Sequence, residues 1–425
     1  MSTQMIIAIA VFVLVMAAIV SEKVHRTAAS LAGAVVLLLT GVLTFDDSLE
    51  AIDFNTLGVL IGMMTFVGVV KESGLFQFLA IKSAKIAKGD PWKIMVFFVI
   101  ITAVLSALLD NVTTVLLIGP MTMTICAILE INPVPFFMTQ ILASNIGGTA
   151  TLIGDPPNIM IGSQAGLSFG DFINYNLPPV VIILVVFCIL FKFMYGKKIL
   201  ANEENMKKVM ELNENEAIID KSLFIKSLVM IAFVVLGFLL HGTIGVESSV
   251  VALTAAAVML IIGKQNIEHI VCNIEWPTII FFVGLFVCVG GLEKVGVIDL
   301  IAEWLMNATG GQMFLTMILL LWASAIVSSI LDNIPFVATM IPVIMTMQQS
   351  GMDVTPLWWA LSLGACLGGN GTLIGASANV VLSGISNREG HKITFMSFTK
   401  VGFPMMLVSV AICCAYLVIR FHSYA

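Results

Sequence analysis

The chain carries a stretch that reads Leu109-Asp110-Asn111-Val112-Thr113-Thr114 and then, after an apolar run, Asn145-Ile146-Gly147-Gly148-Thr149-Ala150-Thr151-Leu152-Ile153-Gly154-Asp155-Pro156-Pro157-Asn158. A near copy reads Leu331-Asp332-Asn333-Ile334-Pro335-Phe336 and then Cys366-Leu367-Gly368-Gly369-Asn370-Gly371-Thr372-Leu373-Ile374-Gly375-Ala376-Ser377-Ala378-Asn379. Helix-breaking polar residues inside apolar runs are costly in a bilayer and are tolerated where they line a site. These four segments are therefore predicted to form one binding site for a transported solute.

Composition places the whole chain in a membrane. Of its 425 residues 59% are hydrophobic and 11% are charged, and the mean hydropathy is +1.06. A soluble domain of this size cannot hide so much apolar surface, so an all-α polytopic membrane protein is expected. The seven cysteines show no metal-type spacing, and no Walker A loop, HExxH or GxSxG motif occurs. We expect no cofactor, no enzymatic activity and no nucleic-acid partner.

An internal repeat divides the chain. Apolar runs before Lys197 are followed by a polar stretch to Lys226, and the same order of runs then restarts with a shift of about 222 residues. Repeats of this length in a membrane protein are typical of secondary transporters. We expect a first repeat over 1–196, a polar linker over 197–226 and a second repeat over 227–425.

The positive charges predict the orientation. If 94–129 is one in-and-back hairpin, the loops at 21–26, 71–93, 192–226, 264 and 388–400 share a side and hold 18 of the 20 Lys and Arg residues. The positive-inside rule makes that side cytoplasmic, with the N-terminus outside the cell (inner) membrane and the linker inside. Each half then crosses an odd number of times, which inverts the second half. Parity leaves open whether the hairpins span or dip and return.

Two further segments are amphipathic. The stretch from Glu72 to Asp90 and its counterpart from Glu293 to Gly311 suit helices lying in the membrane interface or solvated connecting helices, about equally.

Three acids lie in apolar surroundings. Asp110, Asp332 and Asp155 are each costly to bury as isolated charges, so each is expected to hold a cation or a proton. Asp110 and Asp332 also suit N-caps of the second hairpin helices. Asp155 is replaced by Ala376 in the second repeat, so cation or proton handling is expected in the first. A coupling Na⁺ is placed at Asp110, Asn111 and Asp155.

Amides, hydroxyls and a broken helix complete the predicted site. The remaining candidates for binding the solute or ion are Asn111, Thr113, Thr114, Asn145, Gly147, Gly148, Thr149, Thr151, Asn158, Asn333, Gly368, Gly369, Asn370, Thr372 and Asn379. A single Thr here more often bonds its own helix than a ligand. No Lys, Arg or His lies inside the four segments. That favours a cation, a neutral solute, or an anion accompanied by protons or Na⁺.

On the residues from Asp110 to Thr114, Ala143 to Thr151 and Gly154 to Asn158, the chain resembles the ArsB/P-protein branch of the ion transporter superfamily. The run from Gly364 to Val380 is especially similar to the P protein of melanosomes and its bacterial relatives. The resemblance covers essentially the whole chain. It implies two inverted repeats, each with about five transmembrane helices including a broken one, plus a re-entrant hairpin. It also implies a scaffold domain that forms a homodimer and an elevator-like transport domain.

The resemblance leaves the substrate open. The family label implies proton-coupled efflux of arsenite or antimonite, although arsenite pumps carry Asn-Asp where this chain has Asp110-Asn111. Sodium/proton antiporters of the NhaD type share the Asp-Asn-x-x-Thr pattern. Dicarboxylate carriers have Ser-Asn-Thr at the tip, and an acid there argues against a dicarboxylate. The first expectation is a proton- or Na⁺-coupled secondary transporter of an arsenite-type solute; Na⁺/H⁺ antiport or P-protein-type anion transport is the alternative. A membrane aspartyl protease and a passive channel are two further classes.

Overall fold

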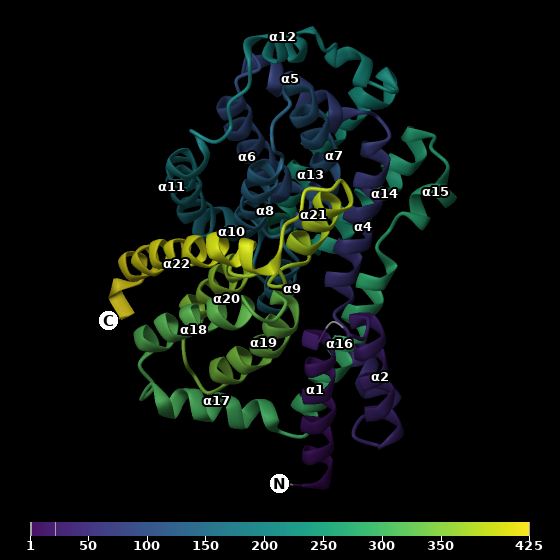
Figure 1. Ribbon diagram of the computed structural model, residues 1–425. Helices are drawn as coiled ribbons and strands as arrows, with labels where there is room; N and C mark the ends of the chain where they lie inside the picture. The colour runs from purple at the N-terminus through teal and green to yellow at the C-terminus, as the bar shows by residue number, and fades with distance from the viewer. Residues whose placement is uncertain (1, 22, 425) are drawn as a thin grey trace.

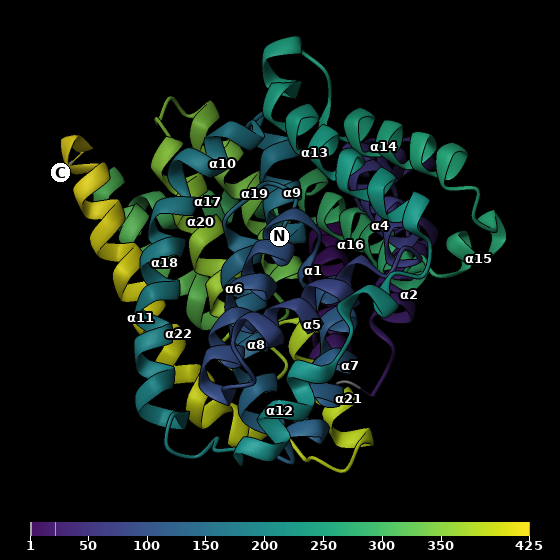
Figure 2. The same ribbon diagram turned by 90° about the horizontal axis from the view of Figure 1, so that it is seen from above.

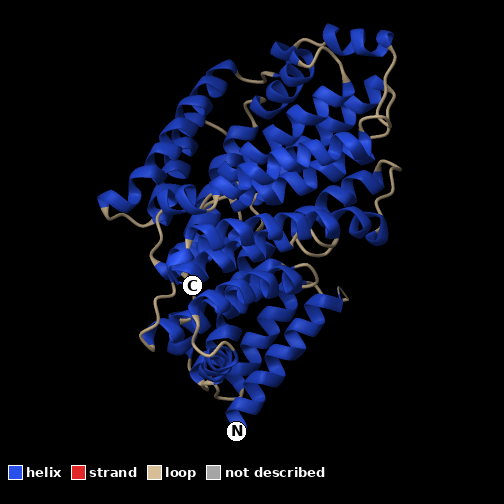
Figure 3. Ribbon diagram, turned by 90° about the vertical axis from the view of Figure 1, so that its left-hand side faces the viewer, coloured by secondary structure: helices blue, strands red, loops and turns tan. Residues whose placement is uncertain are grey.

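The computed structural model describes residues 2–21 and 23–424, and within them every regular element is a helix (Figure 3). The first half contains α1 (Thr3–Ser21), α2 (Arg26–Leu39), α3 (Phe45–Glu50), α4 (Phe54–Lys71), α5 (Leu75–Ile86), α6 (Pro91–Leu108), α7 (Asn111–Leu129), α8 (Val134–Thr149), α9 (Pro156–Ala165), α10 (Phe169–Tyr175) and α11 (Leu177–Tyr195). The second contains α13 (Lys221–Ile244), α14 (Ser248–Gly263), α15 (Ile267–Cys272), α16 (Trp276–Lys294), α17 (Val297–Ala308), α18 (Met313–Ser328), α19 (Asn333–Gln349), α20 (Thr355–Gly368), α21 (Ser377–Arg388) and α22 (Phe395–Arg420). Between them lie α12 (Glu203–Glu211) and the short η1 (Glu214–Ala217), and η2 (His422–Tyr424) ends the described part.

The two halves repeat helix by helix. Adding 222 to the bounds of α3 and α5 gives those of α15 and α17. Gly74 and Gly296, which precede α5 and α17, share a left-handed φ of 81° and 78° that favours glycine. The short α10 has no counterpart between α21 and α22. α13 begins at Lys221, inside the stretch expected to be linker.

Each repeat holds a helical hairpin, α6–α7 and α18–α19. Within the described residues, α5 lies at one end of the molecule and its counterpart α17 at the other (Figure 1), so the hairpins that follow them start from opposite ends. Their tips nevertheless line one cavity, which contains Asn111 and Asn333. Two hairpins that start from opposite ends and meet at their tips cannot both cross the bilayer. The hairpins are therefore re-entrant, and the second repeat is inverted.

The broken helices α8–α9 and α20–α21 form the centre. In α8 every residue from Phe136 to Thr149 is buried, and in α20 every residue from Pro356 to Gly368 is buried. α6 packs on α8 and α18 packs on α20. Each first hairpin helix thus covers its own broken helix, and α7 and α19 reach across to α21 and α9 of the other repeat.

A second group of helices lies beside this centre. This group consists of α2, α4, α14 and α16, which stand to the right of α8, α9 and α20 in both Figures 1 and 2. Small residues bring these helices close: a Cβ added at Gly62 of α4 would lie 2.6 Å from the backbone of Ala252, and one at Gly284 of α16 would lie 2.7 Å from that of Ser30. The two contacts are repeat-related, α4 on α14 and α16 on α2.

Eight of the described helices are long and apolar enough to cross a membrane, or nine if the bent pair α17–α18 is one span. α6 and α7 of the re-entrant first hairpin are among the eight, because this criterion considers only length and composition. The pair α17–α18 bends by 117°, so α17 runs across the direction of α18. Such an arrangement suits the amphipathic segment expected at 293–311. On the first repeat, α12 and η1 pack against α5.

Candidate functional site

The two hairpin tips and the helix break of the first repeat meet at a cavity of about 20 Å³, which has room for one water-sized species. We call it the tip cavity. Its polar lining comes from both repeats: Arg26, Asp110, Asn111, Asp155, Glu275, Thr278, Asn333 and Ser377. Among the described residues, no three His, Cys, Asp or Glu side chains are grouped so as to hold a metal ion. The three carboxyl groups therefore surround the cavity without meeting at one point.

The tip acids cap the second hairpin helices. Oδ1 of Asp110 accepts the N–H of Thr113 at 2.8 Å, and the Thr113 hydroxyl donates to the other oxygen. Asp332 accepts the N–H of Ile334 at 3.3 Å. Both acids therefore cap, and Asp110 also lines the tip cavity. Asp332 instead lines a larger pocket next to it, of about 350 Å³.

Asp155 faces the tip cavity with no capping role. Its side chain makes no cap hydrogen bond to α9, although it stands at the N-cap position. The amide of Asn333 donates to both carboxylate oxygens at 3.3 Å, and the residue is 1% exposed. Ala376 occupies the equivalent place with the same extended backbone. The equivalent place in the second repeat thus has no carboxylate, and that of Asp155 lines the tip cavity.

Four amides join the repeats behind the tip cavity. Nδ2 of Asn145 donates to Asn370 at 2.9 Å and to Asn379 at 2.8 Å, while Asn111 donates to Asn145 at 3.4 Å. All but Asn111, at 5%, have zero exposure. This network connects the first hairpin tip to both broken helices.

Asn158 and Asn379 hold the helix breaks together. Asn158 donates to the carbonyls of Gly148, Thr149 and Thr151 at 3.3, 3.2 and 2.9 Å. Asn379 donates to those of Gly369 and Thr372 at 2.7 and 2.9 Å. Carbonyls at a helix end have no partner in the helix. The two amides supply the missing donors, so their side chains bind backbone in this structure.

The predicted threonines mostly bond the backbone. The hydroxyls of Thr151 and Thr372 donate to Ala107 and Ser329, next to the hairpin tips, and tie each break to its hairpin. Thr149 donates to Asn145 in its own helix. The hydroxyl of Thr114 is buried and has no partner among the described residues.

The glycines allow close backbone contact. A Cβ at Gly147 would lie 2.1 Å from the carbonyl oxygen of Ala103, and one at Gly368 would lie 2.6 Å from that of Ala325. Gly148 and Gly369 abut the chain where it resumes beyond each break, at 154 and 375. These glycines place the breaks against the hairpins, and none of the four lines the tip cavity.

Arg26 is the residue that sequence reasoning missed. Its Nη1 donates to Asp332 at 3.0 Å and to Ser377 at 2.7 Å, and its Nη2 donates to Thr278 at 3.1 Å. The four segments themselves contain no Lys, Arg or His, but the fold brings a cation to the site from outside them. Arg26 begins α2, far along the chain from the four segments, and was counted as a cytoplasmic loop charge. In the second repeat Ser248 stands at its place, and no repeated motif marks it.

Glu275 was also missed, although the repeat marks it. It precedes α16, accepts the hydroxyl of Thr278 at 3.2 Å and lines the tip cavity. Its counterpart Asp53 precedes α4 and bonds Thr56. An acid followed three residues later by Thr in both repeats was the available signal.

With this geometry in view, comparison with known proteins decides the family. The sequence profile described as "Citrate transporter" (CitMHS) matches residues 16–364. The chain is a member of this citrate-transporter family. An uncharacterized transporter of Mycobacterium tuberculosis is 41% identical over 98% of each chain, and a 46 kDa membrane protein of Mycobacterium leprae is 41% identical over 98% of this chain and 99% of its own.

Human P protein is 33% identical to this chain; the match covers 98% of this chain and 60% of P protein. The resemblance to a bacterial P-protein homologue is confirmed. The YdaH transporter of Alcanivorax borkumensis superimposes with a TM-score of 0.62 over 99% of both chains at 15% identity, which shows a shared fold. The chain is a multi-pass membrane transporter.

Proposed function

We propose that this citrate-transporter family member is a secondary active transporter in which a proton or Na⁺ at the tip cavity drives elevator-type movement. The observation that carries the proposal is the tip cavity itself, with carboxyl groups of Asp110, Asp155 and Glu275 around a space for one water-sized species. A cation or proton that neutralises these groups is small enough to fit there.

The surroundings of Asp155 support this role. Burying a carboxylate without a paired cation costs several kcal/mol. Among the described residues, the carboxylate of Asp155 accepts hydrogen bonds from the neutral amide of Asn333. An arriving cation or proton removes this unfavourable charge, which couples occupancy of the tip cavity to the free energy of the surrounding helices.

The tip cavity also lies between the two groups of helices that would move relative to each other in an elevator mechanism. One wall comes from α2, α4 and α16, and the other from the hairpin tips and helix breaks of α7, α9, α19 and α21. In the proposal the first group, with α14, is the scaffold that forms the homodimer, and the second is the transport domain. The protein sits in the inner membrane with its N-terminus outside and its linker in the cytoplasm.

The cargo has three candidates. The resemblance to arsenite pumps puts arsenite or antimonite efflux first, with Na⁺/H⁺ antiport next to it. An anion of the P-protein type is favoured by one observation, the guanidinium of Arg26 on the rim of the tip cavity, and by the description of the family.

The test is flux in proteoliposomes with Na⁺, Li⁺, arsenite, chloride and citrate under imposed proton and Na⁺ gradients. Asp155→Asn is expected to lower coupled flux at least about tenfold and to remove its pH dependence. The exposed acid variant Asp46→Asn is the matched control and should behave as wild type.

Asp155→Ala should leave expression and dimer formation near normal, because Ala376 fills the equivalent place. Wild-type flux with an unchanged pH profile in Asp155→Asn contradicts the proposal. Flux that ignores both gradients identifies a passive channel instead.

A further inference from the structure

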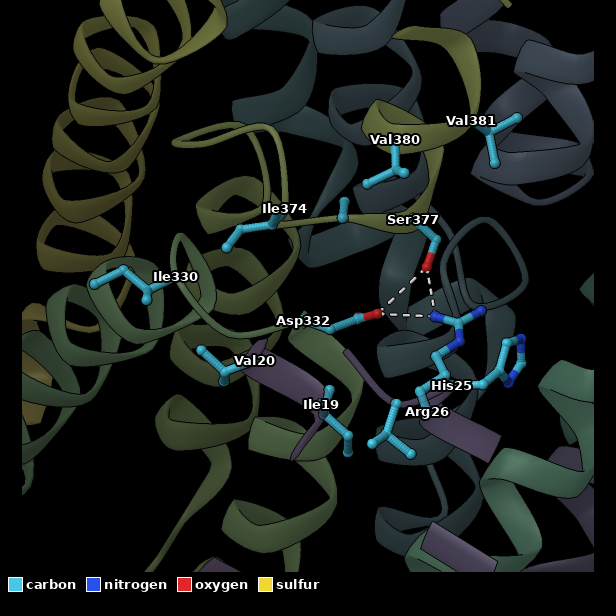
Figure 4. A pocket seen from close by; sticks show the side chains of 12 residues that line it. Ile19, Val20, His25, Arg26, Ile330, Asp332, Ile374, Ser377, Val380 and Val381 are labelled. Atoms are coloured by element: carbon cyan, nitrogen blue, oxygen red, sulfur yellow. Dashed lines mark hydrogen bonds and ion pairs between the residues drawn. The ribbon is translucent and has the colours of Figure 1, made fainter. Parts of the chain in front are cut away.

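A second, larger pocket adjoins the tip cavity. It has a volume of about 350 Å³, within the range of small-molecule sites. Arg26 and Ser377 line both spaces, so the pocket and the tip cavity meet at the guanidinium. Its wall is otherwise largely aliphatic, as Figure 4 shows for Ile19, Val20, Ile330, Ile374, Val380 and Val381.

Arg26 stands at the edge of this aliphatic wall in a fixed position. Its guanidinium carbon lies 5.2 Å from the ring centre of Phe281, and Thr278 accepts from Nη2, whereas Nη1 bonds Asp332. Its side chain keeps 26% exposure, against 12% for that of Asp332. A cation held by an aromatic ring and a hydroxyl, with access to a pocket, is suited to receive an anion.

Asp332 supplies the carboxylate that pairs with Arg26 in this structure. It lies on the pocket side, where Figure 4 shows the dashed contacts from Arg26 and Ser377. Asp332 also accepts the N–H of Ile334 and so retains a partner when Arg26 turns to another anion. The ion pair therefore marks a place beside Arg26 where a carboxylate group fits. A carboxylate from a ligand can take the place of Asp332 there.

We propose that the pocket binds a singly charged organic carboxylate, whose carboxylate joins or replaces Asp332 on Arg26 and whose apolar body packs on the aliphatic wall. This inference rests on the proposed transport function and names its cargo class. Guanidinium and carboxylate match as paired donors and acceptors. A polycarboxylate would place further charges against the aliphatic wall and near Asp332, where the lining adds no Lys or second Arg and His25 is the one other basic side chain.

The binding test uses the full chain in nanodiscs with butyrate, hexanoate, hexanamide and citrate as probes, and empty nanodiscs for lipid uptake. Each CH₂ that is buried on the aliphatic wall should improve affinity about fourfold, so hexanoate should bind about fifteenfold more tightly than butyrate. Hexanamide and citrate should bind at least about tenfold more weakly than hexanoate.

Three variants separate the cation from the wall. Arg26→Gln should weaken hexanoate binding at least about tenfold, and Val380→Phe should weaken it by filling the pocket from a half-exposed position. Asp332→Asn should strengthen it several-fold by removing the internal competitor while the new amide still caps α19. Arg420→Gln, whose partners Asn174 and Tyr175 do not line the pocket, is the control.

Equal affinity for hexanoate, butyrate and hexanamide overturns the inference, as does unchanged hexanoate binding in both Arg26→Gln and Val380→Phe. Failure here is distinct from failure of the proposed function. Gradient-driven flux that requires Asp155 without hexanoate binding rejects only the carboxylate pocket. Hexanoate binding that requires Arg26, with no gradient-driven flux, rejects only the coupled transport.

Discussion

Two buried polar residues at the break of the first repeat have different roles. Asp155 directs its carboxylate to the tip cavity, whereas Asn158, three residues later, gives its amide to three backbone carbonyls. Both are buried to within 1%. The difference lies in what each side chain meets, since a carboxylate cannot donate to carbonyls and an amide can.

Asn158→Ala is therefore expected to destabilise the fold. Buried acceptors that lose their donor cost about 1–3 kcal/mol each, and we expect a net loss of about 2–3 kcal/mol. Thermal unfolding in detergent measures it, with the exposed Asn307→Ala as control. An unchanged unfolding midpoint together with lost transport would make Asn158 a ligand-binding residue instead.

Among whole elements, the linker breaks the symmetry of the repeats. It covers α5 but not α17: Ile219 donates its N–H to Ser73 at 3.1 Å, and Lys85 pairs with Glu214. The hydrogen bond from Lys85 holds the pKa of Glu214 below its usual value. The stabilisation from this contact is therefore complete above the ordinary carboxyl pKa and is lost as the pH falls through the lowered pKa of Glu214.

Gly74→Ala should release the linker. Gly74 and Gly296 share the same left-handed φ, but an added Cβ meets the carbonyl oxygen of Ala217 at 1.9 Å only at Gly74; at Gly296 the nearest atom is 3.9 Å away. Both variants pay about 1 kcal/mol of backbone strain. Hydrogen exchange over 214–219 should rise in Gly74→Ala alone. An equal rise in Gly296→Ala would mean that strain, and not the linker contact, is responsible.

On the scale of the molecule, inversion of the repeats puts the starts of the two hairpins on opposite faces. Lys88 and Gln312 lie just before the two hairpins and are exposed, whereas Pro91 at the start of α6 is buried. Lys88→Cys and Gln312→Cys therefore report which face each hairpin starts from. In a background without the exposed Cys272, an impermeant maleimide should label position 88 from the cytoplasm and position 312 from outside. Labelling of both from one face would contradict the inverted arrangement.

Much of the fold could be predicted because its signals are local or repeated. Apolar length predicted the helices, since each spanning helix must satisfy its own backbone in lipid. The 222-residue repeat predicted the paired hairpins and breaks. The distribution of Lys and Arg predicted that each half crosses the membrane an odd number of times. Asp110 and Asp332 as caps followed from their position alone. None of these inferences needed a contact between distant residues.

Tertiary structure alone decided how the site is assembled. The sequence named Asp155 and Asn333 but could not show that the amide of one bonds the carboxylate of the other across 178 residues. It could not place Arg26 on Asp332, 306 residues away, because nothing local to either residue encodes that pairing. The division of the Asn residues between those that line the tip cavity and those that bind backbone was equally hidden. Long-range partners depend on how helices pack, and packing places one polar residue in the cavity wall and its neighbour against the backbone of a broken helix.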